Sequence, residues 1–213
     1  MHILRDGLIK AVLFDMDGVL IEAKEWHYEA LNMALSHFGL NISLNNHLST
    51  FDGLPTRDKL KILSEKEGLP LGLHQTINDL KQKYTLRLAA QKTRPTFCHE
   101  YLLMELKSAG LKLACCSNSI RKTIDDMLTR ANIVDYFDLV LSNQDVDKAK
   151  PAPDIYLKAI SYFNLEPNQC IVVEDNKNGI DAGLAAGAHV LEIKNTKEVN
   201  ISNLVNFIEN INQ

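Results

Sequence analysis

The sequence has no apolar run long enough to cross a bilayer and no extended cluster of basic residues. Its 213 residues carry 23 Lys and Arg against 27 Asp and Glu, for a formal net charge of -4. A membrane span needs about 20 consecutive apolar residues, and nucleic-acid backbones attract a clustered positive surface. We therefore expect neither a membrane nor a nucleic acid as partner. The apolar stretch Leu8–Phe14 is interrupted by Lys10 and followed by aspartates, unlike a secretory signal.

The four cysteines also lack the spacing of a zinc site: Cys98, Cys115, Cys116 and Cys170. Three of them lie in or beside apolar runs, which is typical of buried thiols in a reducing compartment. Neighbouring residues of a strand point to opposite faces, so Cys115 and Cys116 are expected to pack separately rather than form a redox pair. These features indicate a cytoplasmic protein. The sequence leaves its assembly open between a monomer and a small homo-oligomer.

Short apolar or β-rich runs alternate with helical patterns along most of the chain. The runs are Leu8–Asp15, Lys112–Asn118, Asp138–Asn143, Gln169–Asp175 and Ala188–Ile193. Helices are predicted at Ile120–Ala131, Pro153–Phe163 and Asn178–Ala186, and the tail beyond Asn195 suits a terminal helix. Apolar strands alternating with helices predict an α/β fold with a doubly wound, mainly parallel, Rossmann-like sheet covered on both faces.

One interval breaks this alternation, because residues 24–90 show helical periodicity and no convincing buried strand. Helices are predicted at Glu25–Phe38, Asp58–Glu67 and Leu73–Ala89. We expect an all-helical cap domain, residues 23–92, inserted into an α/β core domain formed by residues 1–22 and 93–213. The cap would lie over the carboxyl edge of the sheet, with hinges near residues 21–24 and 90–95.

Polar groups gather where three of the predicted strands end. Asp15 and Asp17 follow the first strand, Ser117 and Asn118 end the second, and the pair Glu174–Asp175 ends a later one. Ligands of open α/β sheets bind at the carboxyl ends of the strands, so these groups should converge on the core's active site. Two carboxylates about 4 Å apart repel by about 4 kcal/mol at an effective dielectric near 20. Such a cluster needs a cation or raised pKa values, and oxygen ligands favour Mg²⁺.

Each of these motifs by itself also suits a structural role. Asp-Gly is a common turn dipeptide, as at Asp17–Gly18, and Ser-Asn-Ser is a common helix cap, as at residues 117–119. Their joint occurrence at the ends of strands favours a functional site over these structural roles.

In these motifs the sequence resembles the haloacid dehalogenase superfamily, specifically its phosphatase and β-phosphoglucomutase branch. The family pattern Asp-x-Asp-Gly-Val stands at Asp15–Val19, and its serine stands at Ser117. Its lysine before proline is Lys150, and its acidic pair is Glu174–Asp175. All four motifs occur in order, and the resemblance covers essentially the whole chain, helical cap included.

The resemblance implies a Mg²⁺-dependent phosphatase that hydrolyses a small phosphorylated metabolite, a sugar phosphate or similar phosphomonoester. Asp15 would be the nucleophile that forms an aspartyl-phosphate, and Asp17 the general acid and base. Lys150 would offset the negative charge of Asp15 and the phosphoryl group. Lys148 competes for that role, but the Lys-Pro-x-Pro context selects Lys150.

The remaining positions follow from the same resemblance. Ser117, with the amides of Asn118 and Ser119, would bind phosphoryl oxygens. Mg²⁺ would be held by Asp15, the backbone carbonyl of Asp17, Asp175 and, directly or through water, Glu174.

Residues 51–58 of the cap resemble the family's substrate-specificity loop, and His27 lies where relatives often carry a cap histidine. Gly53 would allow close backbone approach, Arg57 could bind a substrate phosphate or carboxylate, and His27 would face the nucleophile. The alternatives are structural. Arg57 could pair with Asp58, with Thr56 capping the helix, and the spacing of His27 also suits a packed core histidine.

The sequence leaves three other functions open: a phosphomutase, a haloacid dehalogenase proper, and a catalytically silent module that binds a phosphorylated ligand. Asp17 argues against a dehalogenase, and the intact acids argue against a silent module. Ser119–Ile120–Arg121 lacks the lysine that some mutases carry after the serine motif, which favours a phosphatase. Ala23 stands where many relatives have a hydroxyl residue.

Overall fold

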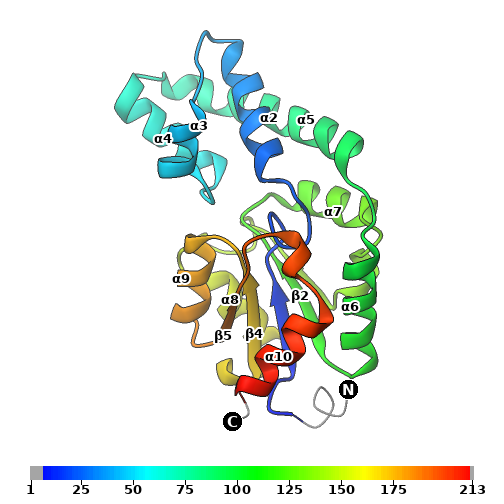
Figure 1. The fold of residues 1–213 in the computed structure, drawn as a ribbon. Coiled ribbons are helices and arrows are strands. Elements are labelled where there is room, and N and C mark those ends of the chain that lie inside the picture. The colour runs from blue at the N-terminus through cyan, green and yellow to red at the C-terminus, as the bar shows by residue number, and fades with distance from the viewer. Residues whose placement is uncertain (1–6, 212–213) are drawn as a thin grey trace.

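The computed structural model describes residues 7–211 and is built on a five-stranded parallel sheet (Figure 1). The strands are β1 (Ala11–Phe14), β2 (Lys112–Cys116), β3 (Leu139–Leu141), β4 (Cys170–Glu174) and β5 (His189–Glu192). Each lies within one of the predicted runs. Their order is β3-β2-β1-β4-β5, so the chain moves outward to β3 and then crosses to the other side of β1. The carboxyl ends of β1 and β4 therefore form the topological switch point where such sheets bind ligands.

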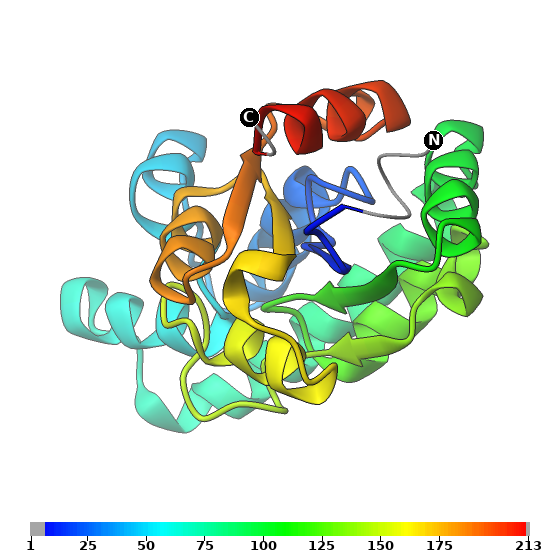
Figure 2. The ribbon, with the colours of Figure 1, turned by 90° about the horizontal axis from the view of Figure 1, so that it is seen from below.

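Helices cover both faces of the sheet (Figure 2). On one face α6 (Phe97–Ser108), α7 (Arg121–Arg130) and α10 (Ile201–Ile211) share an apolar cluster with Val12, Phe14 and Cys115. On the other, α8 (Asp154–Tyr162) and α9 (Lys177–Ala185) pack with Leu13 and Cys116. The strand residues alternate between the two clusters, as the two-residue repeat of a strand requires. The expected separation of Cys115 and Cys116 is thus confirmed, and so is the doubly wound α/β fold.

The interval between β1 and α6 is helical and lies above the carboxyl ends of the strands (Figure 1). It comprises α2 (Lys24–Ser36), α3 (Leu44–Asn46), a π-helical turn η1 (His47–Phe51), α4 (Thr56–Glu67) and α5 (His74–Lys92). The three longer helices correspond to the predicted ones, whereas α3, η1 and α6 were not predicted. These helices have an apolar cluster of their own, which includes Leu31, Leu35, Leu60, Leu63 and Ile77.

Short 3₁₀ turns complete the chain at η2 (Leu71–Leu73), η3 (Val134–Tyr136), η4 (Pro167–Gln169) and η5 (Thr196–Glu198). Across residues 7–211, no helix combines the length and the apolar character that a membrane span requires.

Candidate active site

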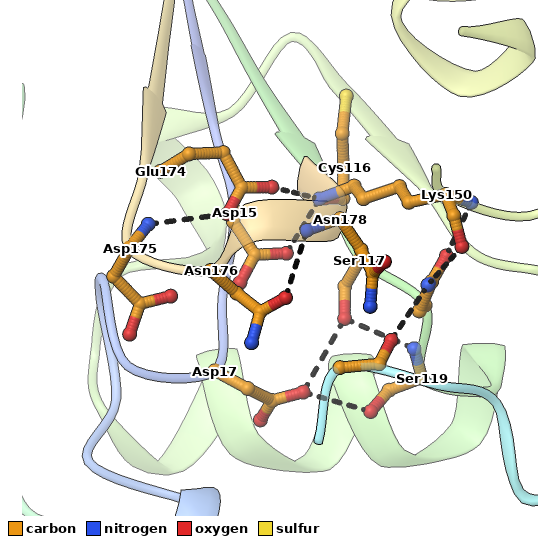
Figure 3. A network of polar contacts seen from close by, with 12 residues as sticks. Asp15, Asp17, Cys116, Ser117, Ser119, Lys150, Glu174, Asp175, Asn176 and Asn178 are labelled. Carbon is orange, nitrogen blue, oxygen red and sulfur yellow. Dashed lines mark hydrogen bonds and ion pairs between the residues drawn. The ribbon is translucent and has the colours of Figure 1, made fainter. Parts of the chain in front are cut away.

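Strand pairing brings three polar groups to one point at the carboxyl edge of the sheet. Phe14, the last residue of β1, lies opposite Cys115 of β2 and Val173 of β4. The residues that come next in the three strands are Asp15, Cys116 and Glu174, respectively. Ser117 follows Cys116 directly. The register of buried strands therefore fixes the backbone positions of the candidate nucleophile, the serine and the acidic pair (Figure 3).

Lys150 ties these strand ends together from the loop that follows β3. Its Nζ atom donates to Asp15 Oδ1 at 2.7 Å, to the Cys116 carbonyl at 2.7 Å and to Glu174 Oε1 at 2.6 Å. An ammonium group has three donors, and all three are used. Burial by itself would lower the pKa of Lys150, but the adjacent Asp15 and Glu174 outweigh it and raise the pKa. Lys150 is therefore a fixed positive charge, whereas Lys148 is exposed as expected.

Asp15 is 8% exposed and shows the carboxylate crowding that the sequence predicts. Burial raises its pKa well above the usual value, repulsion from Glu174 adds to the rise, and Lys150 opposes it. Glu174 is held by a second donor, the Tyr156 hydroxyl, at 2.6 Å from its Oε1. Lys150 alone thus compensates the charge of two carboxylates, so the net charge of the cluster is negative when both are ionised.

Asp17 lies at the centre of a polar network that joins the core to the helical segment. Its Oδ2 accepts from Ser119 Oγ at 2.9 Å and, more weakly, from Ser117 Oγ at 3.4 Å. Its Oδ1 lies 3.0 Å from His27 Nε2. On the far side of the imidazole, Lys81 Nζ lies 3.2 Å from His27 Nδ1. His27 is therefore aimed at Asp17 and is not merely a packed core residue.

Two pKa shifts follow from this network. Burial lowers the pKa of His27, with Lys81 adding to the effect and Asp17 opposing it, so the imidazole is neutral. Lys81 donating to Nδ1 leaves the imidazole proton on Nε2, the ring nitrogen that lies nearer Asp17. Burial would raise the pKa of Asp17, but His27, Ser119 and Lys81 outweigh it and lower that pKa. In the absence of substrate Asp17 is therefore ionised.

Three carboxylates meet the requirements of a metal site. One oxygen each from Asp15, Glu174 and Asp175 lie within 4.8 Å of one another. Both carboxylate oxygens of Asp175 are buried. Oδ1 has no partner within the described part of the chain, and Oδ2 is contacted by the Lys24 ammonium. Burial raises the pKa of Asp175 to about 6, and Lys24 opposes the shift. A buried carboxylate oxygen without a donor, beside two further carboxylates, needs a cation, and an all-oxygen set fits Mg²⁺.

Glycine is required where the first motif turns toward this site. Gly18 has φ +92°, and a Cβ atom there would lie 2.0 Å from Asp175 Oδ2. Any side chain would therefore displace the Asp175 carboxylate from its place beside Asp15.

Three asparagines of the core hold the loop at Asp52 and Gly53. Asn118 Nδ2 donates to the Gly53 carbonyl at 3.1 Å, and Asn176 Nδ2 donates to Asp52 Oδ2 at 2.7 Å. Asn178 Nδ2 donates to the Asp52 carbonyl at 3.3 Å. A Cβ atom on Gly53 would lie 2.4 Å from Asn176 Oδ1. The backbone at Gly53 thus makes the expected close approach, and the group that it approaches is the core residue Asn176. The Asn118 side chain helps to hold this loop.

A cavity of about 600 Å³ lies between the sheet edge and the helical segment. The core contributes Asp15, Asp17, Ser117, Asn118, Lys150 and Glu174, and the helices contribute His27, Gly53, Arg57, Lys59 and Lys81. Arg57 stands at its margin, with a side chain that is 64% exposed and an Nε atom 3.4 Å from Asp58 Oδ1. The pairing with Asp58 that the sequence left open is therefore present. Thr56 does not cap α4, whose N-cap is Pro55.

Sequence reasoning missed five residues that line this cavity, Lys24, Lys59, Lys81, Asn176 and Asn178, and Tyr156, which is buried and bonds Glu174. A signal was available for Lys81, because it continues the buried stripe of α5 through Ile77, Thr85 and Leu88. A lysine on the apolar face of a helix is seldom buried without a reason.

Comparisons with known proteins agree with this architecture. The family model for haloacid dehalogenase-like hydrolases matches residues 12–193. A phosphorylated carbohydrates phosphatase from Thermotoga maritima is 28% identical, over 84% of this chain and 82% of the relative. A phosphoglycolate phosphatase from Aquifex aeolicus is 29% identical, with the same shares covered. The crystal structure of a β-phosphoglucomutase from Clostridium difficile superposes with a TM-score of 0.83 at 24% identity, covering 95% of this chain and 98% of that one.

Proposed function

The chain belongs to the haloacid dehalogenase-like hydrolase family, and on that premise we propose that it is a Mg²⁺-dependent phosphatase acting through an aspartyl-phosphate on Asp15. Its substrate is a small phosphorylated metabolite, a sugar phosphate or similar phosphomonoester. The observation that carries the proposal is the buried pair of Lys150 and Asp15, 2.7 Å apart at the wall of the cavity, with Asp17 two residues further on. The names of the relatives agree with a phosphoric monoester hydrolase.

In the first step an Asp15 oxygen bonds to phosphorus while the ester P–O bond breaks. Lys150 fixes the direction of the Asp15 carboxylate and offsets the charge that gathers on it. The Ser117 hydroxyl and the amides that follow it bind phosphoryl oxygens. The leaving alkoxide takes a proton from Asp17.

Asp17 needs that proton before the step begins. The negative phosphoryl group raises the pKa of a neighbouring carboxyl, so binding of substrate favours the protonated form. His27 and Ser119 hold the carboxyl in place throughout.

In the second step water attacks the acyl phosphate, its proton passes to Asp17, and the bond between phosphorus and Asp15 breaks. Inorganic phosphate leaves and Asp15 is regenerated. Mg²⁺ would be held by Asp15, Asp175, Glu174 and the Asp17 backbone carbonyl, and when bound it supplies positive charge against the phosphoryl oxygens.

We assign residues 1–22 and 93–213 to the core domain and residues 23–92 to a cap. The separate apolar cluster of the helices supports this division, and the asparagine contacts to Asp52 and Gly53 support a closed position of the cap. Closure would keep bulk water away while Asp15 is attacked. We place the protein in the cytoplasm, since the buried thiols Cys115, Cys116 and Cys170 fit a reducing compartment.

The test is release of phosphate from 4-nitrophenyl phosphate with Mg²⁺ or with EDTA, by the native protein and by Asp15→Asn. We expect the native protein to release phosphate with Mg²⁺ but not with EDTA, and Asp15→Asn to release none under either condition. Release that persists in EDTA, or in Asp15→Asn, contradicts the proposal. Sugar phosphates, nucleotides and phosphoglycolate are then assayed for both free phosphate and isomerised substrate, because an isomer without phosphate release would identify a phosphomutase.

A further inference from the structure

Two lysines of the helical segment line the cavity opposite the sheet edge. Lys59 comes from α4 and is 7% exposed, and Lys81 comes from α5 and is 8% exposed. Lysine is almost never this buried unless it is paired. Within residues 7–211 neither ammonium forms an ion pair with a carboxylate, and the hydrogen bond of Lys81 goes to the neutral His27.

Nearby carboxylates compensate the charge of the two lysines only in part. Burial lowers the pKa of Lys59 to about 8, although Asp52 and Asp17 oppose the shift. Burial lowers the pKa of Lys81 to about 7, with Lys59 adding to the shift and Asp17 opposing it. Asp52 is engaged elsewhere, since its Oδ2 accepts from Asn176 at 2.7 Å. Keeping both buried lysines charged is therefore costly unless an anion joins them.

The His27 ring separates Lys81 from the reacting end of the cavity. Asp17 lies on one side of the His27 ring and Lys81 on the other. The phosphoryl group under attack must lie on the Asp17 side, between Asp15 and Ser117. A cavity of about 600 Å³ has room for a larger molecule than one phosphate.

We propose that Lys59 and Lys81 form a second anion-binding subsite and that the substrate carries a second negatively charged group, a phosphate or a carboxylate, at the end remote from Asp15. The inference rests on the proposed function for the position of the reacting phosphate. Arg57 is a weaker candidate for this subsite, because it is exposed and pairs with Asp58.

Equilibrium binding tests the subsite without any turnover. Isothermal titration with Mg²⁺ present compares three non-hydrolysable probes of matched chain length: an alkyl monophosphonate, an alkane bisphosphonate and a phosphonocarboxylate. The probes with two anions should bind at least ~10-fold more tightly than the monophosphonate, as charge-assisted hydrogen bonds predict. The better of the two identifies the second group as phosphate or carboxylate.

Variants then assign the preference to the two lysines. Lys59→Met and Lys81→Met should each reduce the preference for a second anion by about 10-fold. Lys61→Met and Lys83→Met, which change exposed lysines of the same two helices, should retain it. Thermal unfolding verifies that each variant is folded, and Lys59→Gln and Lys81→Gln replace any that is not.

Equal affinity for all three probes overturns the proposal, and so does a preference that survives in both lysine variants. If Lys81→Met slows release from 4-nitrophenyl phosphate but keeps the preference, Lys81 only positions His27 and does not belong to the subsite. The outcome is separable from the proposed function. Loss of Mg²⁺-dependent phosphate release in Asp15→Asn tests the chemistry, whereas the phosphonates report binding alone.

Discussion

The cavity has a core wall, formed by the strand ends, and a cap wall, formed by the helical segment. The two walls carry opposite charges that are only partly compensated. On the core wall, Asp15 and Glu174 share one fully bonded lysine, Lys150, and Asp175 pairs with Lys24 through Oδ2 alone. On the cap wall, Lys59 and Lys81 have no carboxylate partner among the described residues. The core therefore needs a cation and the cap needs an anion.

This difference separates the reaction from the choice of substrate. Attack on phosphorus requires the same groups for every phosphomonoester, so the core wall is assembled from strand ends whose positions are rigid. The part of the substrate that does not react meets the cap, where helix packing decides which side chains reach the cavity. Substitutions on the core wall should therefore have larger effects than substitutions on the cap wall.

The largest effect is expected from Lys150→Met, because it leaves Asp15 and Glu174 buried without compensation. Breaking a buried ion pair costs about 3–5 kcal/mol of stability, and turnover should be lost. Burial raises the pKa of Asp15, so the loss of stability should grow as the pH rises through that pKa and shrink at lower pH. Urea unfolding at several pH values, in EDTA, measures this, with Lys148→Met as an exposed control. Equal stability of Lys150→Met and native protein would contradict a stabilising role of Lys150 between Asp15 and Glu174.

The next effect concerns Asp17, which joins the two walls through His27. Asp17→Asn keeps the shape of the residue and its backbone carbonyl but removes the proton exchange. Turnover of alkyl phosphates should fall on the order of 10²-fold or more, with a smaller loss for aryl phosphates, whose leaving groups need less protonation. Steady-state kinetics on both substrate classes measures this difference. Alkyl phosphate turnover near the native rate would remove Asp17 from the mechanism.

Metal binding should depend more on Asp175 than on Glu174. Glu174 Oε1 is occupied by Lys150 and Tyr156, whereas Asp175 Oδ1 has no partner among residues 7–211 and only Lys24 contacts Oδ2. Asp175→Ala should weaken Mg²⁺ binding by more than the ~10–100-fold typical of an outer-shell partner. Titration calorimetry measures the affinity, and Asp181→Ala on the exposed side of α9 is the control. Unchanged affinity in Asp175→Ala would refute the assignment.

The smallest effect is expected from Arg57→Ala on the cap wall, because the side chain is exposed and already paired with Asp58. KM for the physiological substrate should rise only a few-fold, since exposed ionic contacts are weak, and aryl phosphates should be affected less. Kinetics with both substrates provides the comparison. If the two lose activity alike, Arg57 acts on the structure of α4 and not on the substrate.

The same division explains what the sequence could predict. Most of the core wall was accessible because Asp15, Ser117 and Glu174 lie at the ends of buried strands, and neighbouring parallel strands end together. Lys150 lies in the loop after β3 and was identified only by the resemblance of its Lys-Pro-x-Pro motif.

The cap wall depends on how helices cross, which no local pattern fixes. Lys59 and Lys81 lie 22 residues apart in sequence and meet only because α4 and α5 pack over the sheet. The apolar spacing of Leu102, Leu103 and Leu106 in α6 was present but not recognised. The asparagines that hold Asp52 and Gly53 required the loop conformation itself.

The most direct test of the account is detection of the phosphoryl group on Asp15. Native protein is mixed with a ³²P-labelled phosphomonoester and Mg²⁺, quenched in acid within milliseconds, and digested for mass spectrometry. We expect transient label that hydroxylamine removes, as an acyl phosphate requires, located on the peptide containing Asp15 and absent from Asp15→Asn. Turnover without any labelled protein, or label on another residue, would contradict nucleophilic catalysis by Asp15.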